Sequence, residues 1–544
     1  MQKNSGLTAS AAPNKRDDTR LMLIIGISLV ILVALAARII PGPRIIDDAY
    51  ITFRYSRNIV EGQGFVYNPG EYTLGTTTPL YTLLMAAISF VLRGEDFPTY
   101  AIAVNALADA GTAVLLFLIV RRLTGRTLTG TVLGVLLGVL WGIAPMSVTF
   151  AVGGMETSLS IFFAIAAVWL YLEDRVFWMG IVVGLGFLTR IDALLWIGPL
   201  LLYQLVEQWR NLSLTPYTAG TKPGLSAFLA HIPWRTWLAA VLTSLPWLLF
   251  SLFYFGSPIP HSLLAKSAAY LIPPGAQFTW LLPRLTTPFF ESGPLIILDA
   301  LIYLVLNILG IVFAARKLPR LLPYLIYPWL YFIVFSIANP PVFRWYTAPP
   351  LPAVMLGIVA GVWAILERLQ RMSRTLPFAA AGVALVAVLW GGSSLNAWTA
   401  HPDHGPDRPA PQMAFFALEL NYEKMATLLR DKYGVASDTL VASADIGTIG
   451  YFSRARIIDT VGLVTPALTA YYPLSPGLIV LGQNYAIPPQ MILDTKPEYL
   501  VTMEAFVRLG LEEDATFRAD YGDPVEMIPT GYYGTDMRVY KRKS

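Results

Sequence analysis

Cysteine is absent from the sequence, and histidine is scarce. Without cysteine among its 544 residues, the chain cannot form disulfides, use a thiolate nucleophile or bind zinc through sulfur. Four histidines argue against a histidine-rich metal site. The net charge is only +4 and no basic tract is present, so nucleic acid is not an expected partner.

Charge is also low for a chain of this length. Charged residues make up 14% of the sequence and hydrophobic residues 55%, whereas soluble proteins carry about a quarter of their residues as charge. The apolar residues form runs of about bilayer length, which predicts a polytopic membrane protein. These runs lie at roughly 21–40, 99–120, 127–145, 157–172, 176–189, 191–206, 237–256, 293–314, 320–338, 348–366 and 376–393.

A further apolar run, at 79–92, has a length that suits an interfacial or re-entrant helix better than a span. If it does not cross, the basic connections all face the N-terminal side, which is the positive-inside pattern. We therefore expect about eleven spans, a cytoplasmic N-terminus held by a retained first helix, and an outer C-terminus. The basic connections hold Arg121, Arg122, Arg126, Arg175, Arg210, Lys222, Arg235, Arg316, Lys317, Arg320, Arg368, Arg371 and Arg374.

The composition changes after Trp390. The stretch PDHGPDRPAP cannot continue a helix, and beyond it NYEKMATLLRDKYG has helical spacing while DTLVASAD resembles a strand. The predicted fold is an all-α polytopic membrane protein with a small extracytoplasmic α/β domain. Its predicted parts are a cytoplasmic tail (1–20), a transmembrane domain (21–394) with large outer loops at 44–98 and 257–292, a linker (395–411) and the α/β domain (412–544).

Two adjacent carboxylates begin the first outer loop. Asp47 and Asp48 precede AYITFRYSRNIVEG, a predicted helix that ends at Gly62 and carries Arg54 and Arg57 on one side. One carboxylate would suffice to cap this helix. A pair beside the bilayer needs a nearby cation, either a divalent metal shared by both aspartates or the two arginines. The pair would also suit deprotonation of an acceptor hydroxyl during sugar transfer. Capping, metal binding and base catalysis therefore remain alternatives.

Other charged residues at the predicted outer face are candidates for the same pocket. Glu156 begins a span, where an acid also suits the helix dipole. Arg190 and Asp192 lie between two short apolar helices and form either a buried structural pair or donor contacts. Lys266 suits a lipid phosphate or a snorkelling position. Arg344, in an aromatic stretch, is either an interfacial anchor or another phosphate contact.

The run DDAYITFRYSRNIVEGQGFVYNPGE follows the first predicted transmembrane helix. It resembles the first external loop of GT-C glycosyltransferases, which are integral-membrane enzymes that use polyprenyl-phosphate sugars. The sequence of this run is most similar to that of the mycobacterial terminal arabinofuranosyltransferase group and its bacterial relatives. Protein O-mannosyltransferases and lipid A aminoarabinose transferases are more distant members. The resemblance covers the membrane part and is strongest over residues 45–80.

This resemblance implies roles for individual residues. In the superfamily an acidic residue of this loop is the catalytic base or binds a metal, and by position that role falls on Asp47 or Asp48. The family also places interfacial helices in this loop. A similar Gly-Met-Glu-Thr sequence occurs in the resembling group, which implies that Glu156 is a pocket residue. The resemblance also favours a site-facing position for Arg190 and Asp192, and it implies inversion at the anomeric carbon.

The predicted C-terminal domain carries ADIGTIGYFSRARIIDTVGLVTP, at 444–466. Its glycines mark turns, because neither of the common glycine motifs for nucleotides is present in the required context. Similar wording recurs near the C-terminus of the resembling transferases. We assign this stretch no catalysis and expect it to bind acceptor or to form a lid over the cavity.

The sequence thus predicts a glycosyltransferase of the bacterial cytoplasmic membrane with its active site on the extracytoplasmic face. A polyprenyl-phosphate sugar would be the donor, and an envelope glycan, a glycolipid or a protein the acceptor. Asp47 or Asp48 would be the base, with the shared divalent metal as the one cofactor alternative. The predicted phosphate contacts are some of Arg54, Arg57, Arg190, Lys266 and Arg344.

A lipid-linked sugar flippase is the alternative function. It would also need many spans, but it would place charged or helix-breaking residues near span centres, often in repeated halves. In this sequence the polar candidates cluster at the predicted outer ends of the spans and no repeat is apparent. This distribution favours the transferase.

Overall fold

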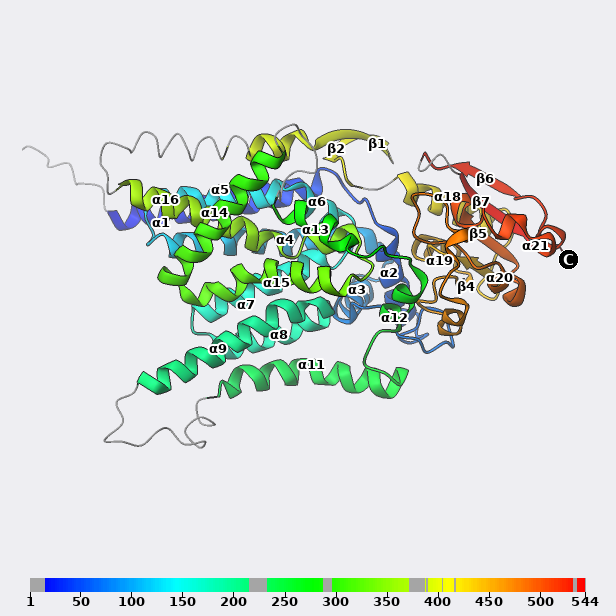
Figure 1. Cartoon of the computed structure of the whole chain (residues 1–544), viewed down its shortest axis with the longest axis horizontal. Helices are drawn as coiled ribbons and strands as arrows, with labels where there is room; N and C mark the ends of the chain where they lie inside the picture. The colour runs from blue at the N-terminus through cyan, green and yellow to red at the C-terminus, as the bar shows by residue number, and fades with distance from the viewer. Residues whose placement is uncertain are drawn as a thin grey trace, which may run out of the picture.

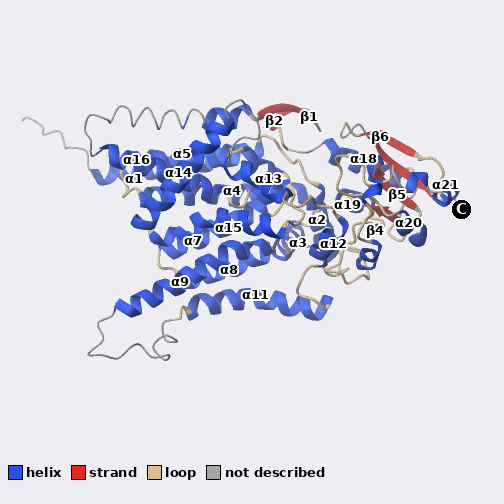
Figure 2. Cartoon of the chain, viewed as in Figure 1, coloured by secondary structure: helices blue, strands red, loops and turns tan. Residues whose placement is uncertain are grey.

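The computed structural model has a helical bundle at one end and a mixed α/β domain at the other (Figure 1). Almost all strands belong to the α/β domain, and one hairpin lies beside the bundle (Figure 2). The structure describes residues 15–214, 232–286, 296–370, 387, 390–403, 405–414, 417–531 and 536–543.

Apolar helices form the bundle, and the long ones run in roughly the same direction (Figure 1). They are α1 (Lys15–Ile39), α4 (Phe97–Leu123), α5 (Leu128–Ile143), α6 (Pro145–Val152), α7 (Thr157–Leu172), α8 (Val176–Thr189), α9 (Leu194–Leu214), α11 (Trp234–Phe255), α13 (Ala276–Thr286), α14 (Ile296–Lys317), α15 (Leu322–Ala338) and α16 (Leu351–Gln370).

The bundle makes the chain an integral membrane protein. Within the described residues, six helices are long and apolar enough to span a bilayer, or seven if α5 and α6, bent by 47°, count as one span. The predicted total of eleven spans and the cytoplasmic N-terminus remain predictions, and most of the run at 376–393 lies outside the described residues. The six helices contain Arg20–Ile39, Phe97–Leu123, Trp234–Phe255, Ile297–Lys317, Pro319–Ala338 and Arg344–Gln370.

Helices α14 and α16 lie very close together because glycines occupy their crossing. A Cβ atom on Gly310 would lie 1.9 Å from the carbonyl oxygen of Gly357, and one on Gly361 would lie 2.0 Å from that of Leu306. Small residues allow helix backbones in membranes to approach in this way. The contact fixes α16, which directly follows the segment that contributes Tyr346 to the candidate site.

The loop at 44–98, which the sequence predicts to lie outside, contains the two expected short helices, α2 (Asp47–Val60) and α3 (Pro79–Leu92). Asp47 and Asp48 lie inside the first turn of α2 instead of preceding it, and the N-cap residue is Ile46. Helix α2 is buried from both sides. Phe53 belongs to the bundle core, whereas Tyr55 belongs to the core of the C-terminal domain.

The C-terminal domain is built on a five-stranded sheet with the order β4-β3-β5-β7-β6. Strands β4, β3 and β5 are parallel, and β7 and β6 extend the sheet antiparallel. This confirms the small C-terminal α/β region. The strands are β3 (Leu440–Ser443), β4 (Arg456–Asp459), β5 (Tyr499–Met503), β6 (Glu526–Pro529) and β7 (Asp536–Lys541); the helices are α18 (Ala417–Asp431), α19 (Gly447–Ser453), α20 (Pro489–Thr495) and α21 (Ala515–Asp520).

The segment interpreted as a linker contains a hairpin. Strand β1 (Trp398–Asp403) pairs antiparallel with β2 (Gly405–Pro411). Its first residue is tied to the bundle, because the Trp398 indole donates to the carbonyl of Ile143 at 3.1 Å. The connection between the two parts of the chain is therefore anchored to the end of α5.

Arg54 joins α2 to the C-terminal domain. Its guanidinium is buried and donates to the carbonyl oxygen of Tyr67 at 2.9 Å and to the side-chain oxygen of Asn68 at 3.1 Å. The same group donates across the interface to the carbonyls of Gly450 at 2.7 Å and Ala455 at 2.6 Å. A planar guanidinium serves four acceptors at fixed positions in a way that an ammonium group cannot.

We expect Arg54→Lys to loosen the C-terminal domain. Lysine lacks the branched guanidinium, so some of the buried acceptors lose their donor. We expect this loss to lower the free energy of unfolding by on the order of 3 kcal/mol. Limited proteolysis and thermal unfolding of the purified protein would then report cleavage and unfolding at lower temperature than in wild type.

Arg454→Lys is the matched control for this substitution. Arg454 also joins the two parts, through Glu61 and Glu95, but its side chain is 49% exposed. Exposed ion pairs contribute at most about 1 kcal/mol. Equal effects of the two substitutions would contradict the role given to Arg54.

Candidate active site

A polar cavity opens where α2, the segment 75–78 and helix α12 (His261–Ala269) meet the bundle. Its volume is about 70 Å³, and its wall includes Leu463 from the C-terminal domain. A second cavity of about 270 Å³ adjoins it. The residues lining both are Thr77, Arg190, Leu263, Lys266 and Tyr346.

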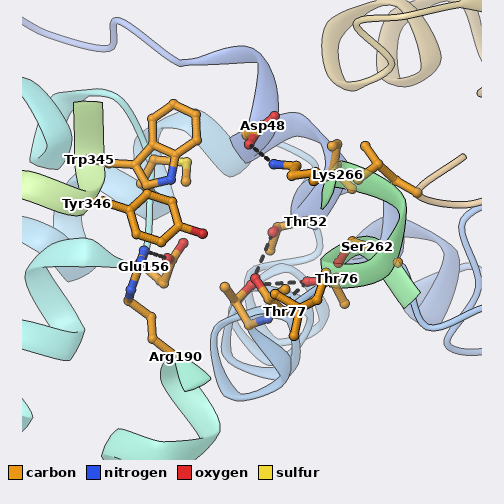
Figure 3. A pocket seen from close by; sticks show the side chains of 16 residues that line it. Asp48, Thr52, Thr76, Thr77, Glu156, Arg190, Ser262, Lys266, Trp345 and Tyr346 are labelled. Atoms are coloured by element: carbon orange, nitrogen blue, oxygen red, sulfur yellow. Dashed lines mark hydrogen bonds and ion pairs between the residues drawn. The ribbon is translucent and has the colours of Figure 1, made fainter. Parts of the chain in front are cut away.

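Asp48 lies in the first turn of α2 and points toward this cavity (Figure 3). Lys266 of α12 lies opposite, and its Nζ is 3.2 Å from the Asp48 Oδ2. The ammonium group also lies 4.5 Å from the centre of the Phe343 ring. Burial alone would lower the pKa of Lys266, but the charge of Asp48, its hydrogen bond with Lys266 and the nearby Tyr346 and Asp459 together raise the pKa. Two residues far apart in sequence thus form one charged pair on the cavity wall.

The carboxylate of Asp47 points away from Asp48, toward the C-terminal domain. It accepts hydrogen bonds from the backbone N–H groups of Gly447, at 3.0 Å, and Thr448, at 2.7 Å. A Cβ atom on Gly447 would lie 1.8 Å from the Asp47 carbonyl oxygen. Asp47 therefore caps a helix as one alternative proposed, but the helix is α19 and not α2.

A third charged group is formed by Glu156, Arg190 and Asp192. Figure 3 shows Glu156 and Arg190 of this group. Glu156 precedes α7, and Asp192 lies in the 3-10 turn η1 (Ile191–Ala193) that follows α8. The Arg190 Nη1 donates to Glu156 at 2.6 Å, and its Nε and Nη2 each donate to Asp192 at 2.9 Å. The guanidinium lies 4.8 Å from the centre of the Tyr346 ring. The break between α8 and α9 therefore brings both residues of the predicted pair to the cavity.

The other predicted phosphate contacts lie elsewhere. Arg54 is committed to carbonyl groups as described, and Arg57 donates to the carbonyl of Tyr451 at 2.8 Å. Arg344 is exposed at the start of the 3-10 turn η3 (Arg344–Thr347). None of these three arginines is among the described residues that line the two cavities.

The structure adds residues that the sequence did not single out. Asp445 follows β3 and accepts a hydrogen bond from Tyr422 of α18, and Glu419 of the same helix is buried beside it. Hydroxyl groups of Thr52, Thr76 and Thr78 form a chain along one wall of the cavity (Figure 3). The run of threonines was visible in the sequence, but only the fold shows what their hydroxyls face.

The two aspartates do not converge on one metal position. Asp47 is bound to α19, whereas Asp48 pairs with Lys266. Among the described residues, no group of three or more His, Asp or Glu side chains has the spacing needed to hold a metal ion. The arrangement therefore gives the shared-metal alternative no ligand set around this pair.

Buried acids lie along the contact between α2 and the C-terminal domain. Burial and the nearby charge of Asp445 raise the pKa of Asp47. Burial and the charge of Asp48 likewise raise the pKa of Asp445, against the opposing influence of Lys266. Burial, with a further contribution from Asp47, raises the pKa of Glu419 to about 8. These side chains therefore hold protons that they would lose if the two parts separated.

We expect the contact to weaken as the pH rises from about 4.5 to about 8. The docked state binds more protons than the separated state over this range, so rising pH favours separation. Hydrogen exchange at the amides of α18 and α19, corrected for the intrinsic exchange rate, measures how the contact weakens with pH.

Glu419→Gln should flatten this pH profile of hydrogen exchange and protect these amides at pH 8. Asp431→Asn, at an exposed site on the same helix, should leave the profile unchanged. A Glu419→Gln profile identical to wild type would contradict the interpretation.

Solved structures share this fold. The chain is similar to ArnT from Cupriavidus metallidurans bound to undecaprenyl phosphate, with a TM-score of 0.52 and 13% identity over 97% of this chain and 98% of ArnT. It is similar to the apo state of ArnT with a TM-score of 0.53 and 13% identity, over 96% of this chain and 98% of ArnT.

Sequence comparison gives two partial matches. One is the terminal β-(1→2)-arabinofuranosyltransferase of Mycobacterium tuberculosis, 26% identical over 244 residues. The match covers 41% of this chain and 35% of the relative, so it spans about a third of that protein. Residues 412–540 match a family described as a domain of unknown function, DUF8728. The chain therefore shares the fold of ArnT over nearly its whole length.

Proposed function

We propose that the chain is a glycosyltransferase that takes a sugar from a polyprenyl-phosphate donor on the outer face of the membrane. The observation that carries this proposal is the pairing of Asp48 with Lys266 in the cavity, within an ArnT-like fold. A carboxylate beside a cation provides a base and a phosphate contact a few ångströms apart. The acceptor is an envelope glycan, a glycolipid or a protein.

Asp48 is the residue we assign as the base. It would accept the proton of the acceptor hydroxyl while the hydroxyl oxygen attacks the anomeric carbon. The bond between that carbon and the phosphate oxygen breaks, and polyprenyl phosphate leaves. Asp47 is less suited to this step, because both of its carboxylate oxygens already accept backbone N–H groups of α19.

Lys266 is the residue we assign to the donor phosphate. It lines both cavities, so its ammonium group can contact a phosphate held between them. Charge on a departing phosphate is stabilised by a positioned cation in a site that excludes water. Arg190 also lines both cavities, but its nitrogens already donate to carboxylates, so we assign it to the sugar end of the site.

The relatives support the class of donor. Undecaprenyl phosphate is bound to ArnT in one of the similar structures, and the partial sequence relative is an arabinofuranosyltransferase by name. A polyprenyl-phosphate arabinofuranose is therefore the first donor to test. The outer location of the site rests on the distribution of lysine and arginine along the sequence.

The test is sugar transfer by the purified protein in lipid nanodiscs. Polyprenyl-phosphate sugars are supplied with envelope glycans, and the release of polyprenyl phosphate is followed. We expect Asp48→Asn to lower kcat by about 100-fold or more, which is the usual contribution of a general base. Lys266→Met should raise KM for the donor, because it removes a phosphate contact.

Asp47→Asn is the matched control, since it changes the neighbouring carboxylate in the same isosteric way. We expect a smaller loss, together with looser docking of α19. Equal turnover in wild type and Asp48→Asn would remove Asp48 from the chemistry. Movement of donor lipid between leaflets without transfer by the wild type would support the flippase instead. The same transfer assay with a chelator added tests the divalent-metal alternative.

A further inference from the structure

Arg190 is shared by two carboxylates that come from different parts of the bundle. Glu156 precedes α7, and Asp192 lies in the turn between α8 and α9. We propose that this trio selects donor sugars that carry no acid group, with Glu156 and Asp192 accepting hydrogen bonds from sugar hydroxyls. The inference rests on the proposed function and names the class of sugar that the site takes.

Two carboxylates already outweigh the single positive charge of Arg190, so the group as a whole does not attract a further anion. Its Nε, Nη1 and Nη2 each donate to a carboxylate oxygen of Glu156 or Asp192 at 2.6–2.9 Å. The Tyr346 ring lies beside the guanidinium. The three charged side chains are 4–11% exposed, so solvent screening is weak and the pairing holds the guanidinium in place.

The charges around the two cavities support the same inference. Among the described residues that line them, the cations are Arg190 and Lys266, and the carboxylates are Asp48, Glu156 and Asp192. Both cations already have carboxylate partners. The donor phosphate brings one further negative charge, which we assign to Lys266. An acidic sugar would add another anion beside carboxylates in a buried site, and like charges there repel strongly.

The same carboxylates suit a sugar with free hydroxyl groups. Each carboxylate oxygen has two lone pairs, and Arg190 occupies only part of this capacity. Hydroxyl groups of a neutral sugar donate hydrogen bonds to such oxygens without adding charge. Tyr346, beside Arg190, and Trp345 on the same wall provide flat surfaces against which a sugar ring can lie (Figure 3). In this arrangement Arg190 is a positioning residue that holds both acceptors toward the sugar.

The test compares two lipids that differ only at the sugar, and polyprenyl phosphate without a sugar serves as the reference. Wild-type protein in nanodiscs is titrated with polyprenyl phosphate, polyprenyl-phosphate glucose and polyprenyl-phosphate glucuronic acid, so the last two differ at one carbon. We expect the glucose lipid to bind at least tenfold more tightly than the glucuronic acid lipid. In Glu156→Gln and in Asp192→Asn the ratio should fall to about threefold or less, since each removes one negative charge.

Glu173→Gln is the control variant. Glu173 ends α7 at the opposite end from Glu156 and is 42% exposed, so the ratio should stay at its wild-type value. Binding of polyprenyl phosphate itself shows whether each variant is folded and whether the donor class is correct.

Several results would overturn the inference. They are equal binding of the two sugar lipids, tighter binding of the acidic one, binding of polyprenyl phosphate but of neither sugar lipid, or an unchanged ratio in both variants. Failure of wild-type protein to bind polyprenyl phosphate would instead overturn the proposed function and this inference with it. The two failures are therefore distinguishable.

Discussion

The buried guanidinium of Arg54 is the contact on which the candidate site depends. It holds helix α2 against carbonyl groups of the C-terminal domain, and Asp47 adds a second attachment by capping α19. With α2 held at these points, the next residue, Asp48, lines the cavity. The C-terminal domain thus takes part in building the site, and it supplies Leu463 to the wall.

A low dielectric explains why the charged side chains occur in pairs. Water is largely excluded from the wall that carries Arg190, so an unpaired charge there would carry a desolvation penalty of several kcal/mol. Pairing with Glu156 and Asp192 removes most of this penalty and fixes the three side chains. Asp48 and Lys266 are more exposed, at 28% and 20%, so their pair can open when a phosphate approaches. The proposed sugar end of the site is therefore more buried than the proposed phosphate end.

Local pattern predicted the elements better than the contacts between them. A helix directly after Asp48, the helix at 79–92, and the first helix and strand of the C-terminal domain followed from periodicity and turn residues. Each charged residue of the cavity could be selected from the sequence individually, because a charge beside a bilayer is costly unless it is paired or functional. These residues are Asp48, Glu156, Arg190, Asp192 and Lys266. The role of Arg54 was missed, since its partners lie some 400 residues away in the chain. Which aspartate faces the cavity was also undetermined, because two adjacent residues differ only in their tertiary neighbours.

The most direct measurement is an experimental structure of the protein in nanodiscs with bound polyprenyl phosphate. We expect the phosphate to bind between the two cavities, within hydrogen-bond distance of the Lys266 Nζ and beside Asp48. We also expect Arg54 to remain bound to the C-terminal domain. A phosphate bound outside these cavities, for example against Arg57 or Arg344, would contradict the central claim that this cavity is the donor site.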